Sequence, residues 1–542
     1  MNCFNTLDRP LLVQKINQSV YDLLIIGGGI TGAGIALDAA SRGFRTLLIE
    51  KNDFASGTSS KSTKLIHGGL RYLKQFEIAL VREVGLERAI IHRLAPHLVK
   101  SEKMLLPLIK DGTYGKILTS VGLMVYDVLA GVEKADQRKM LTKEETLEEE
   151  MLIDESILEG GGIYAEYRTD DARLTIEVLK TAASYGADII NYAEALDFNY
   201  EAGTIAGIRW RDNLNRAENN TKGTYTVSAT GPWVDELRAK NKSLTGKRLH
   251  PTKGVHIVVP HERFPVRHAI YFDVPDGRMI FAIPRGRATY VGTTDTDYFG
   301  DLNDVRVTRE DVQYLVEGVN HIFPKVNLSV EEVESTWVGL RPLIGEEGKE
   351  ASDLSRKDEI FESDTGLLSI AGGKLTGYRK MAERIVNLIV EKEKAEKPCM
   401  TEWISLNGGL FKGSVEVDTY TRQVERKLQN EGLAHLAAYL VGNYGRQTDL
   451  ILEHFNALDG HIPDVRLGLA ELEFCVHNEA VFSALDFLEH RTGRLFFDIH
   501  SISFLKEPVL DFLTNFFNWT DEKRAIERGL VEEAVYRATH FE

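Results

Sequence analysis

The side chains best suited to chemistry in this 542-residue chain are one histidine and a few cations. His256 lies in the alternating segment Gly254–Pro260, and imidazole is the natural proton acceptor near neutral pH if it faces a site. Lys374 follows two glycines at the start of an expected helix, an arrangement that stabilises anions. Arg341 and Arg356 add positive charge nearby in the sequence. These residues indicate a proton acceptor and an anion site, whereas a core histidine and a solvated run of charges are the alternatives.

Two further segments combine glycine with hydroxyl or aromatic side chains. Residues 56–62 read SGTSSKS and residues 64–72 read KLIHGGLRY, so Arg71 and Tyr72 end a stretch rich in hydrogen-bonding groups. Such a stretch can bind a pyrophosphate and a flat ring. The turn Ala229–Trp233 follows a short strand and would let a ligand approach the backbone. A flexible serine-rich loop and a simple Gly-Pro turn are the alternative interpretations.

The elements that must position these side chains begin with Tyr21–Glu50, which reads YDLLIIGGGITGAGIALDAASRGFRTLLIE. The apolar run Leu23–Ile26 predicts a short buried strand. Ile30–Arg42 then predicts a helix, which Gly43 ends. Phe44–Ile49 predicts a second strand, so the whole stretch has the order strand, glycine turn, helix, strand.

Three glycines of this unit, Gly27, Gly29 and Gly32, have the spacing of a dinucleotide-binding turn. The first allows the tight turn, the second lets the backbone approach a pyrophosphate, and the third packs helix on strand. The helix N-terminus offers N–H groups and positive partial charge to the phosphates. Glu50, at the end of the second strand, can accept hydrogen bonds from both ribose hydroxyls. The unit therefore predicts a bound dinucleotide, and an ordinary strand–helix–strand turn is the alternative.

Composition limits the classes of function. The formal net charge of −16 argues against nucleic-acid binding, because phosphate affinity needs a basic surface. Cys3, Cys399 and Cys475 are far apart, so they predict neither a disulfide framework nor a metal cluster and suit a reducing cytosol. The N-terminus lacks the plan of a signal peptide, and no apolar run has the length of a membrane-spanning helix.

The rest of the chain divides into a sheet region and a helical end. Helical periodicity covers residues 76–105. The alternating segments Gly254–Pro260 and Met279–Gly292 predict strands of a mixed or antiparallel sheet, and Pro284–Arg287 splits the second into a hairpin. From about residue 400 the pattern is helical, which predicts a separate C-terminal helical domain.

Taken in order, these motifs resemble the FAD-dependent glycerol-3-phosphate dehydrogenases of the aerobic, quinone-linked type. The matching segments are IIGGGITGAGIALDAASRG, TSSKSTKLIHGGLRYL, DDARL, ATGPWV, KGVHIVVP, VGTTDTDY, GLRPL and AGGKLTGYRK. The resemblance covers the chain from about residue 20 to its end. Two positions depart from the family pattern, Gly377 where a second threonine is common and His490 where an arginine is common. The first would loosen a contact with the flavin, and the second is expected to bear little on the chemistry.

The resemblance implies an α/β fold with a Rossmann-type FAD-binding domain, an antiparallel-sheet substrate cap like that of amino-acid oxidases, and a C-terminal all-α domain. Within residues 1–395, FAD-binding parts at about 20–90, 160–245 and 345–395 would alternate with cap parts at about 91–159 and 246–344. The helical domain would cover residues 400–542. The residues implied at the cofactor are Gly27, Gly29, Gly32, Glu50, Thr58, Ser59, Ser60, His67, Gly68, Gly69, Leu70, Gly231, Trp233, Gly373, Lys374, Leu375 and Thr376.

The implied reaction oxidises sn-glycerol 3-phosphate to dihydroxyacetone phosphate, with FAD taking the hydride and a membrane quinone the electrons. His256 is the expected base, and Arg341 is the alternative group that orients the developing alkoxide. No metal is expected. The substrate-binding residues expected from the resemblance are Arg71, Tyr72, Thr294, Arg356 and Lys374.

Several alternatives are open at this point. A glycerophosphate oxidase would carry out the same half-reaction with oxygen as acceptor and make hydrogen peroxide. An amine or amino-acid oxidase of the same fold would need an arginine for a carboxylate. An FAD-bound structural or sensing protein would lack polar groups at the reactive face of the flavin. An NAD enzyme agrees with the first motif alone, but the GGKLTGYR segment favours a flavin.

The resemblance also implies a location and partners. It implies a cytoplasmic protein that adheres reversibly to the inner face of the cell membrane to reach quinone, and a homodimer is an open alternative to a monomer. The aromatic residues Phe512, Phe516, Phe517 and Trp519 are candidate membrane contacts, although a core position is the more frequent role of such side chains.

Overall fold

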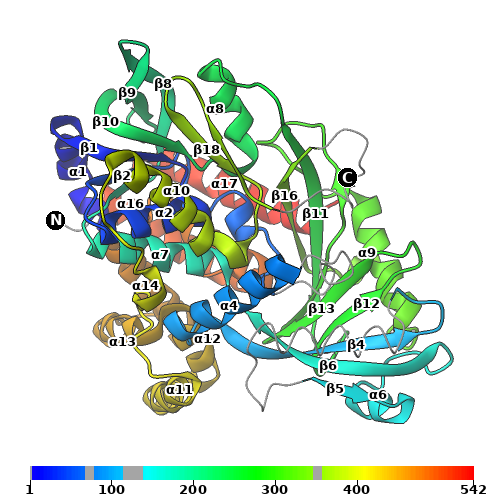
Figure 1. Ribbon diagram of the computed structural model, residues 1–542. Helices are drawn as coiled ribbons and strands as arrows, with labels where there is room; N and C mark the ends of the chain where they lie inside the picture. Colours follow the sequence, from blue (N-terminus) through cyan, green and yellow to red (C-terminus); the bar gives the residue numbers. More distant parts are fainter. Residues whose placement is uncertain (1–2, 68–77, 114–137, 346–356, 542) are drawn as a thin grey trace.

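The computed structural model describes residues 3–67, 78–113, 138–345 and 357–541. Two β-sheets and a C-terminal set of helices make up this part of the chain (Figure 1). Some residues predicted for the site lie outside the described residues, namely Gly68, Gly69, Leu70, Arg71, Tyr72 and Arg356.

The first sheet contains the strand that precedes the glycine turn. Its strands are β1 (Val20–Ile26), β2 (Thr46–Ile49), β7 (Asp188–Ile190), β8 (Ala193–Glu201), β9 (Thr204–Asp212), β10 (Glu218–Ser228), β17 (Glu359–Glu362) and β18 (Leu367–Ala371). The order is β17-β18-β10-β1-β2-β7, and the pairs from β18 to β7 are parallel. β8 and β9 extend from β10 as antiparallel strands, and β17 is antiparallel to β18.

Both faces of this sheet are covered, which explains the continuous apolar run Leu23–Ile26 in β1. On one face, α2 (Ile30–Ser41) packs between α7 (Asp171–Ser184) and α10 (Tyr378–Glu393), and Leu23 and Ile25 are buried beneath these helices. On the other face, Leu24 and Ile26 are buried against residues of β8 and β9. The predicted strand, helix and second strand of the glycine unit are therefore all present.

The second sheet supplies the region around His256. Its strands are β3 (Leu65–Ile66), β4 (Lys100–Ile109), β5 (Lys139–Leu141), β6 (Leu158–Arg168), β11 (Leu249–Pro260), β12 (Ala269–Asp273), β13 (Met279–Arg285), β14 (Ala288–Gly292), β15 (Thr296–Asp297) and β16 (Ser335–Ile344). The order is β15-β11-β14-β13-β12-β4-β6-β3, with β16 paired to β11 and β5 to β6. All pairs are antiparallel except β12 with β4. The hairpin predicted at residues 284–287 is confirmed.

Alternation along β11 places its side chains on opposite faces of the second sheet. Val255, Ile257 and Val259 pack against α9 (Arg309–Ile322), whose apolar face covers one side. Val258 faces the other side, where the C-terminal helices pack. The second sheet therefore lies between α9 and the C-terminal helices. The predicted domain boundaries stay a prediction, although β3, from a segment assigned to the FAD-binding part, joins this sheet.

The C-terminal part is helical, as predicted. Its main helices are α11 (Ser414–Leu428), α12 (Ala437–Tyr444), α13 (Thr448–Ala457), α14 (Pro463–Asn478), α15 (Arg494–Phe497), α16 (Ile499–Phe517) and α17 (Asp521–Thr539), with a π-helical segment at Asp486–Arg491. The aromatic residues Phe512, Phe516, Phe517 and Trp519 are half-buried against the core of these helices. Among the described helices, none combines the length and the apolar character needed to cross a membrane.

One predicted helix is shorter than its sequence periodicity indicated. The pattern covered residues 76–105, but α4 (Ile78–Leu94) ends at Leu94 and β4 begins at Lys100. Pro96 explains the difference, because a proline disfavours helical backbone at the residue before it and cannot donate a helical hydrogen bond. Residues 100–105 therefore form a strand of the second sheet.

Candidate cofactor and substrate site

The glycine turn after β1 has contacts that no larger residue would allow. Gly27 has a φ of 116°, and a Cβ atom there would lie 2.5 Å from the carbonyl oxygen of Ala229. A Cβ at Gly32 would lie 1.9 Å from the carbonyl oxygen of Gly27. Gly29 begins the helix, and the next backbone N–H, that of Ile30, donates to Ser59 Oγ (2.9 Å). The turn is thus tight and α2 packs directly on it, as the spacing predicted.

Glu50, at the end of β2, is fixed beside this turn. Its Oε2 accepts a hydrogen bond from the N–H of Gly28 (2.7 Å), and its Oε1 accepts one from the N–H of Asn52 (2.9 Å). Burial raises the pKa of Glu50, while the two backbone hydrogen bonds and Lys51 act in the opposite direction. The side chain is therefore oriented by the backbone and offers its remaining lone pairs to a ligand.

A cavity opens at the carboxyl ends of the parallel strands. It encloses about 1330 Å³ of empty space, including its open mouth, and is bordered by the residues that follow β1, β2, β10 and β18. This is the edge of a parallel sheet at which dinucleotides bind. The predicted cofactor residues that line the cavity are Gly27, Gly29, Glu50, Thr58, Ser59, Gly231, Trp233, Gly373, Lys374 and Leu375.

The other described cofactor candidates lie behind this lining. Ser60 is buried, and its carbonyl oxygen accepts a hydrogen bond from Lys64 Nζ (3.0 Å). Thr376 is also buried, and its hydroxyl donates to the carbonyl oxygen of His67 (3.4 Å). Direct contacts of Ser60, His67 and Thr376 with a cofactor stay a prediction.

Two lining residues also tie the cavity to the second sheet. The hydroxyl of Thr58 donates to the carbonyl oxygen of Leu340 in β16 (2.7 Å). The indole N–H of Trp233 donates to Asn303 Oδ1 (3.0 Å), and Lys51 Nζ lies 4.1 Å from the centre of its ring. Turns that follow strands of the first sheet therefore contact β16 and the loop after β15 at the wall of the cavity.

Lys374 lies where β18 leads into α10. Gly372 and Gly373 before it have φ values of 77° and 76°, and a Cβ at Gly372 would lie 2.5 Å from the carbonyl oxygen of Lys357. These glycines let the backbone turn sharply towards the cavity. Lys374 follows as a half-buried lining residue just before a short 3₁₀ turn (Leu375–Gly377) that leads into the helix. A lysine near a helix N-terminus provides positive charge for an anion.

His256 is buried, with an exposed fraction of 1%. Its ring stacks on Trp337 with centroids 4.6 Å apart, and its Nε2 lies 3.0 Å from Thr63 Oγ1. Its Nδ1 has no hydrogen-bond partner among the described residues. Burial first, then the charges of Arg341 and Lys64, hold the pKa of His256 well below its ordinary value. The imidazole is therefore neutral at neutral pH and can accept a proton.

Arg341 lies close to His256, on the neighbouring strand β16. Its Nη1 donates to Asp295 Oδ1 (3.0 Å), and its Nη2 donates to Thr293 Oγ1 (2.9 Å). A Cβ at Gly254, two residues before His256, would lie 2.4 Å from Arg341 Nη2. The guanidinium thus lies against the backbone of Gly254 and is oriented by Asp295. The next residue in β16, Pro342, lines the cavity.

The hydroxyl of Thr294 is hydrogen-bonded to the backbone of β11. Its hydroxyl accepts from the N–H of Val255 (3.0 Å) and donates to the carbonyl oxygen of Lys253 (3.4 Å). The side chain is buried. In the structure it holds the segment before β15 against β11, and the substrate contact predicted for Thr294 stays a prediction.

Sequence reasoning missed the partners that orient the two candidate catalytic residues. Thr63 and Asp295 lie in segments that carried the family resemblance, and Trp337 lies two residues before one, but none was assigned a role. It also missed further lining residues, among them Glu194 in β8 and Glu236 in α8 (Val234–Lys240). No spacing rule signals such contacts, because they form between strands that are distant in sequence.

The fold and the cavity define a dinucleotide-binding oxidoreductase of two sheets with a helical C-terminal domain. Comparison with known families agrees, since residues 22–379 match "FAD dependent oxidoreductase" and residues 399–524 match "C-terminal domain of alpha-glycerophosphate oxidase". The chain belongs to the FAD-dependent oxidoreductases, in the family of the aerobic glycerol-3-phosphate dehydrogenases. The fold class predicted from the sequence is thereby confirmed, and so is the family resemblance.

Relatives similar to this chain cover nearly its whole length. The aerobic glycerol-3-phosphate dehydrogenase of Bacillus subtilis (strain 168) is 48% identical over 530 residues, 96% of each chain. That of Staphylococcus aureus (strain USA300) is 46% identical over 548 residues, 99% of this chain and 98% of the relative.

Solved structures show the same fold. The glycerol-3-phosphate dehydrogenase from Bacillus halodurans, in complex with FAD, matches with a TM-score of 0.85 and 41% identity over 99% of each chain. An L-α-glycerophosphate oxidase from Mycoplasma pneumoniae with FAD bound has a TM-score of 0.57 and 19% identity. It covers 72% of this chain and 98% of its own, and it shares the fold alone.

Proposed function

We propose that this chain oxidises sn-glycerol 3-phosphate to dihydroxyacetone phosphate as an FAD-dependent enzyme and delivers the electrons to a membrane quinone. The observation that carries the proposal is the cavity itself, which has a glycine turn and Glu50 along its wall and Lys374 in its lining. The names of relatives with 46–48% identity over nearly the whole chain support the substrate.

The residues present fit FAD. The glycine turn leaves no room for a Cβ and brings the backbone to the cavity, where a pyrophosphate would lie at the N-terminus of α2. Glu50, already oriented by Gly28 and Asn52, would hold the ribose hydroxyls. Lys374 and the backbone after β18 would hold the isoalloxazine end. When bound, FAD supplies a two-electron acceptor for the hydrogen on carbon.

His256 is the proposed acceptor of the proton from the C2 hydroxyl. A pKa well below the ordinary value keeps the imidazole neutral but also makes it a weak base in the free protein. A bound phosphate dianion would offset the nearby positive charge and raise this pKa towards the working pH. Arg341, fixed by Asp295 and Thr293, would orient the developing alkoxide.

The phosphate of the substrate needs several fixed cations. Lys374 in the cavity lining is the described candidate, and Arg71, Tyr72 and Arg356 complete the proposed set. Charge-assisted contacts of this kind would distinguish glycerol 3-phosphate from glycerol.

We propose quinone as the acceptor because the relatives at 46–48% identity are named aerobic dehydrogenases, whereas the named oxidase is 19% identical. Access to quinone would come from reversible attachment of a cytoplasmic protein to the inner face of the membrane. The half-buried packing of Phe512, Phe516, Phe517 and Trp519 favours a core role for these residues, so other surfaces would make that contact. A homodimer is compatible with this scheme.

The test is anaerobic reduction of the purified protein. Glycerol 3-phosphate should bleach the absorbance of bound FAD, while glycerol and glycine should leave it unchanged. A soluble quinone analogue should then restore the absorbance faster than air does. Bleaching by an amino acid, or by no substrate in this set, would contradict the proposal. Faster recovery in air would instead identify the oxidase.

A further inference from the structure

The loop after β2 forms a large part of the cavity wall. We call Lys51–Lys61 the cofactor loop. Its members at the cavity are Lys51, Asn52, Ala55, Ser56, Gly57, Thr58 and Ser59. Asp53 and Phe54 are buried on the opposite side of the loop. The shape of the cavity therefore depends on what holds that buried side.

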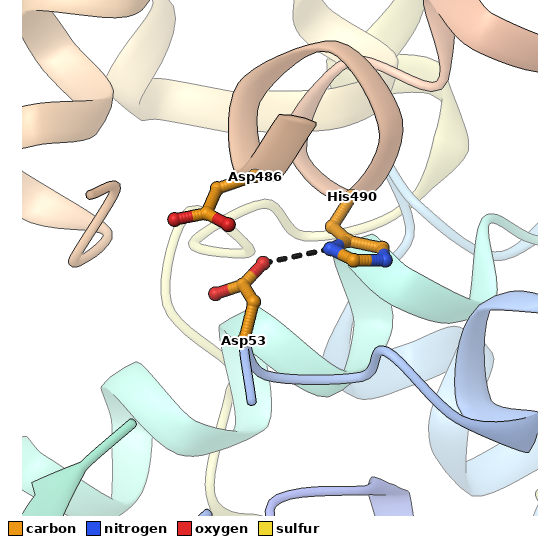
Figure 2. Close-up of side chains that lie close together, drawn as sticks. All are labelled: Asp53, Asp486 and His490. Carbon is orange, nitrogen blue, oxygen red and sulfur yellow. Dashed lines mark hydrogen bonds and ion pairs between the residues drawn. The ribbon is translucent and has the colours of Figure 1, made fainter. Parts of the chain in front are cut away.

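One segment of the C-terminal domain holds this loop at both ends. In the π-helical segment, Arg491 donates from Nη1 to Asp53 Oδ2 (2.6 Å) and from Nη2 to Asp53 Oδ1 (2.8 Å). His490 Nδ1 lies 2.8 Å from Asp53 Oδ2, as Figure 2 shows. Glu489 accepts a hydrogen bond from Lys61 Nζ at the far end of the loop. Three consecutive side chains thus bind two points of the cofactor loop.

Figure 2 also shows Asp486 beside this pair. The ligand atoms of Asp53, Asp486 and His490 lie within 4.8 Å of one another, an arrangement that resembles a metal site. However, the charge of Asp53 is already balanced by Arg491 and His490. Asp486 accepts a hydrogen bond from the hydroxyl of Tyr192 (2.5 Å). The group is therefore an ion-pair cluster with hydrogen-bonded neighbours.

A displacement of Asp53 would also move its neighbours in the cofactor loop, which contact Glu50 and the glycine turn. The preceding residue, Asn52, donates its N–H to Glu50. Phe54 packs beneath Gly28, where a Cβ would lie 2.9 Å from its ring. The N–H of Ala55 donates to the carbonyl oxygen of Gly28 (3.1 Å). Every residue next to Asp53 thus contacts either Glu50 or the glycine turn.

Burial makes the contacts between Arg491 and Asp53 costly to break. The side chain of Arg491 is 0% exposed and that of Asp53 is 3% exposed. A buried charge that loses its partner is strongly unfavourable, so the pair must keep its geometry. Bidentate arginine–carboxylate contacts also fix direction as well as distance. The C-terminal domain therefore constrains the position of the cofactor loop.

We propose that Glu489, His490 and Arg491 are positioning residues for FAD, through which the C-terminal domain sets the affinity of the cofactor site. Within the described part of the chain, their contacts with the cofactor loop are the ion pairs with Asp53 and Lys61. The expectation from the sequence that position 490 bears little on the chemistry stays a prediction, and the experiment below tests it against this role. The inference rests on FAD binding and not on the identity of the substrate.

The experiment measures the FAD dissociation constant of the full-length apoprotein by quenching of flavin fluorescence, without substrate, at neutral pH. His490→Gln and Glu489→Gln remove one charge each and keep similar side-chain volume. Each should weaken FAD binding about tenfold or more, the size of one lost charge-assisted contact. His490→Arg restores the cation and should restore most of the affinity.

The matched control is Arg494→Lys. Arg494 is buried in the same domain and donates to Glu471 (2.8 Å), with no contact to the cofactor loop in the described structure. This variant should lose stability and keep the FAD affinity. The proposal is overturned if the two glutamine variants, folded by circular dichroism, bind FAD like the parent. It is also overturned if Arg494→Lys weakens FAD binding as much as they do.

Discussion

His256 shows how the surroundings of one residue set its chemistry. It stacks on Trp337 and touches Thr63 through Nε2, so its ring has little freedom to rotate. Thr63→Val should slow flavin reduction about tenfold, because it removes a hydrogen bond that orients the base, while the KM for glycerol 3-phosphate changes little. Thr63→Ser should retain most of the rate. Anaerobic stopped-flow reduction measured from about pH 6 to pH 9 checks this.

Two outcomes would separate orientation from mere packing. If Thr63→Val shifts the pH dependence of reduction and Thr63→Ser does not, the hydroxyl acts through the imidazole. Equal rates for both variants and the parent at every pH would exclude Thr63 as a partner of the base. His256→Ala should slow reduction further and leave substrate binding closer to normal, whereas Lys374→Ala should mainly raise KM.

His490 gives the fold a pH dependence of its own. Glu489 and Asp53 face the imidazole and, against the effect of burial, raise the pKa of His490 to about 9. Because this lies above the ordinary value near 6.5, protonation stabilises the fold fully below about pH 6.5. The contribution is lost as pH rises through about 9. The free energy of unfolding of the holoprotein should therefore fall over this range.

His490→Arg isolates that effect, since arginine keeps its charge throughout. Urea unfolding at several pH values should show a smaller loss of stability for this variant between about pH 7 and pH 10 than for the parent. Because the two proteins differ only at position 490, the difference between their curves reports the loss of the imidazole charge. Parallel curves for the two proteins would contradict the assignment.

At the scale of elements, Gly32 determines how α2 meets β1. A Cβ at this position would lie 1.9 Å from the carbonyl oxygen of Gly27, which is backbone and cannot move aside cheaply. Gly32→Ala should displace the helix from the turn, abolish tight FAD binding and destabilise the fold by about 2 kcal/mol or more. FAD content after purification and thermal unfolding measure the two effects.

Gly377→Ala is the matched control near the other end of the cavity. Apart from the neighbouring backbone, no atom of the described residues would lie within 4 Å of a Cβ there, and the backbone is not left-handed. The variant should bind FAD normally. The substitution should stabilise the fold by roughly 0.5–1 kcal/mol, because it reduces the entropy of the unfolded chain. Loss of FAD from this variant would show that the departure from threonine at position 377 matters to the cofactor.

The elements themselves were predictable where local pattern decides them. The turn at Gly27–Gly32, its flanking strands and the hairpin at residues 284–287 follow from glycine, proline and apolar spacing. The helix predicted from apolar periodicity was wrong at residues 100–105, which form the start of β4. The spacing of apolar residues takes no account of Pro96, which ends the helix. The pairing of β12 with β4 brings together segments more than 150 residues apart, and no local signal encodes it.

At the scale of the whole molecule, the family resemblance predicted the fold class and ten of the residues that line the cavity. It could not predict which charges meet across domains. Asp53 and Arg491 are 438 residues apart, and each looks like an ordinary surface residue in the sequence. Their burial becomes visible only when the C-terminal helices pack on the rest of the protein. Ion pairs between residues so far apart in the sequence depend on the tertiary structure, and the spacing of residues in the sequence does not reveal them.

The parts of the cofactor site are also synthesised at different times. Its strands come from residues 20–26, 46–49, 218–228 and 367–371, and the side of the loop away from the cavity is closed by Arg491. During synthesis from the N-terminus, the glycine turn leaves the ribosome long before the strand and the arginine that complete its surroundings. Contacts this distant in sequence form late in folding. With Arg491 in the proposed positioning role, tight loading of FAD follows translation of nearly the entire chain, and chains that stop short of Arg491 should lack a stably bound flavin.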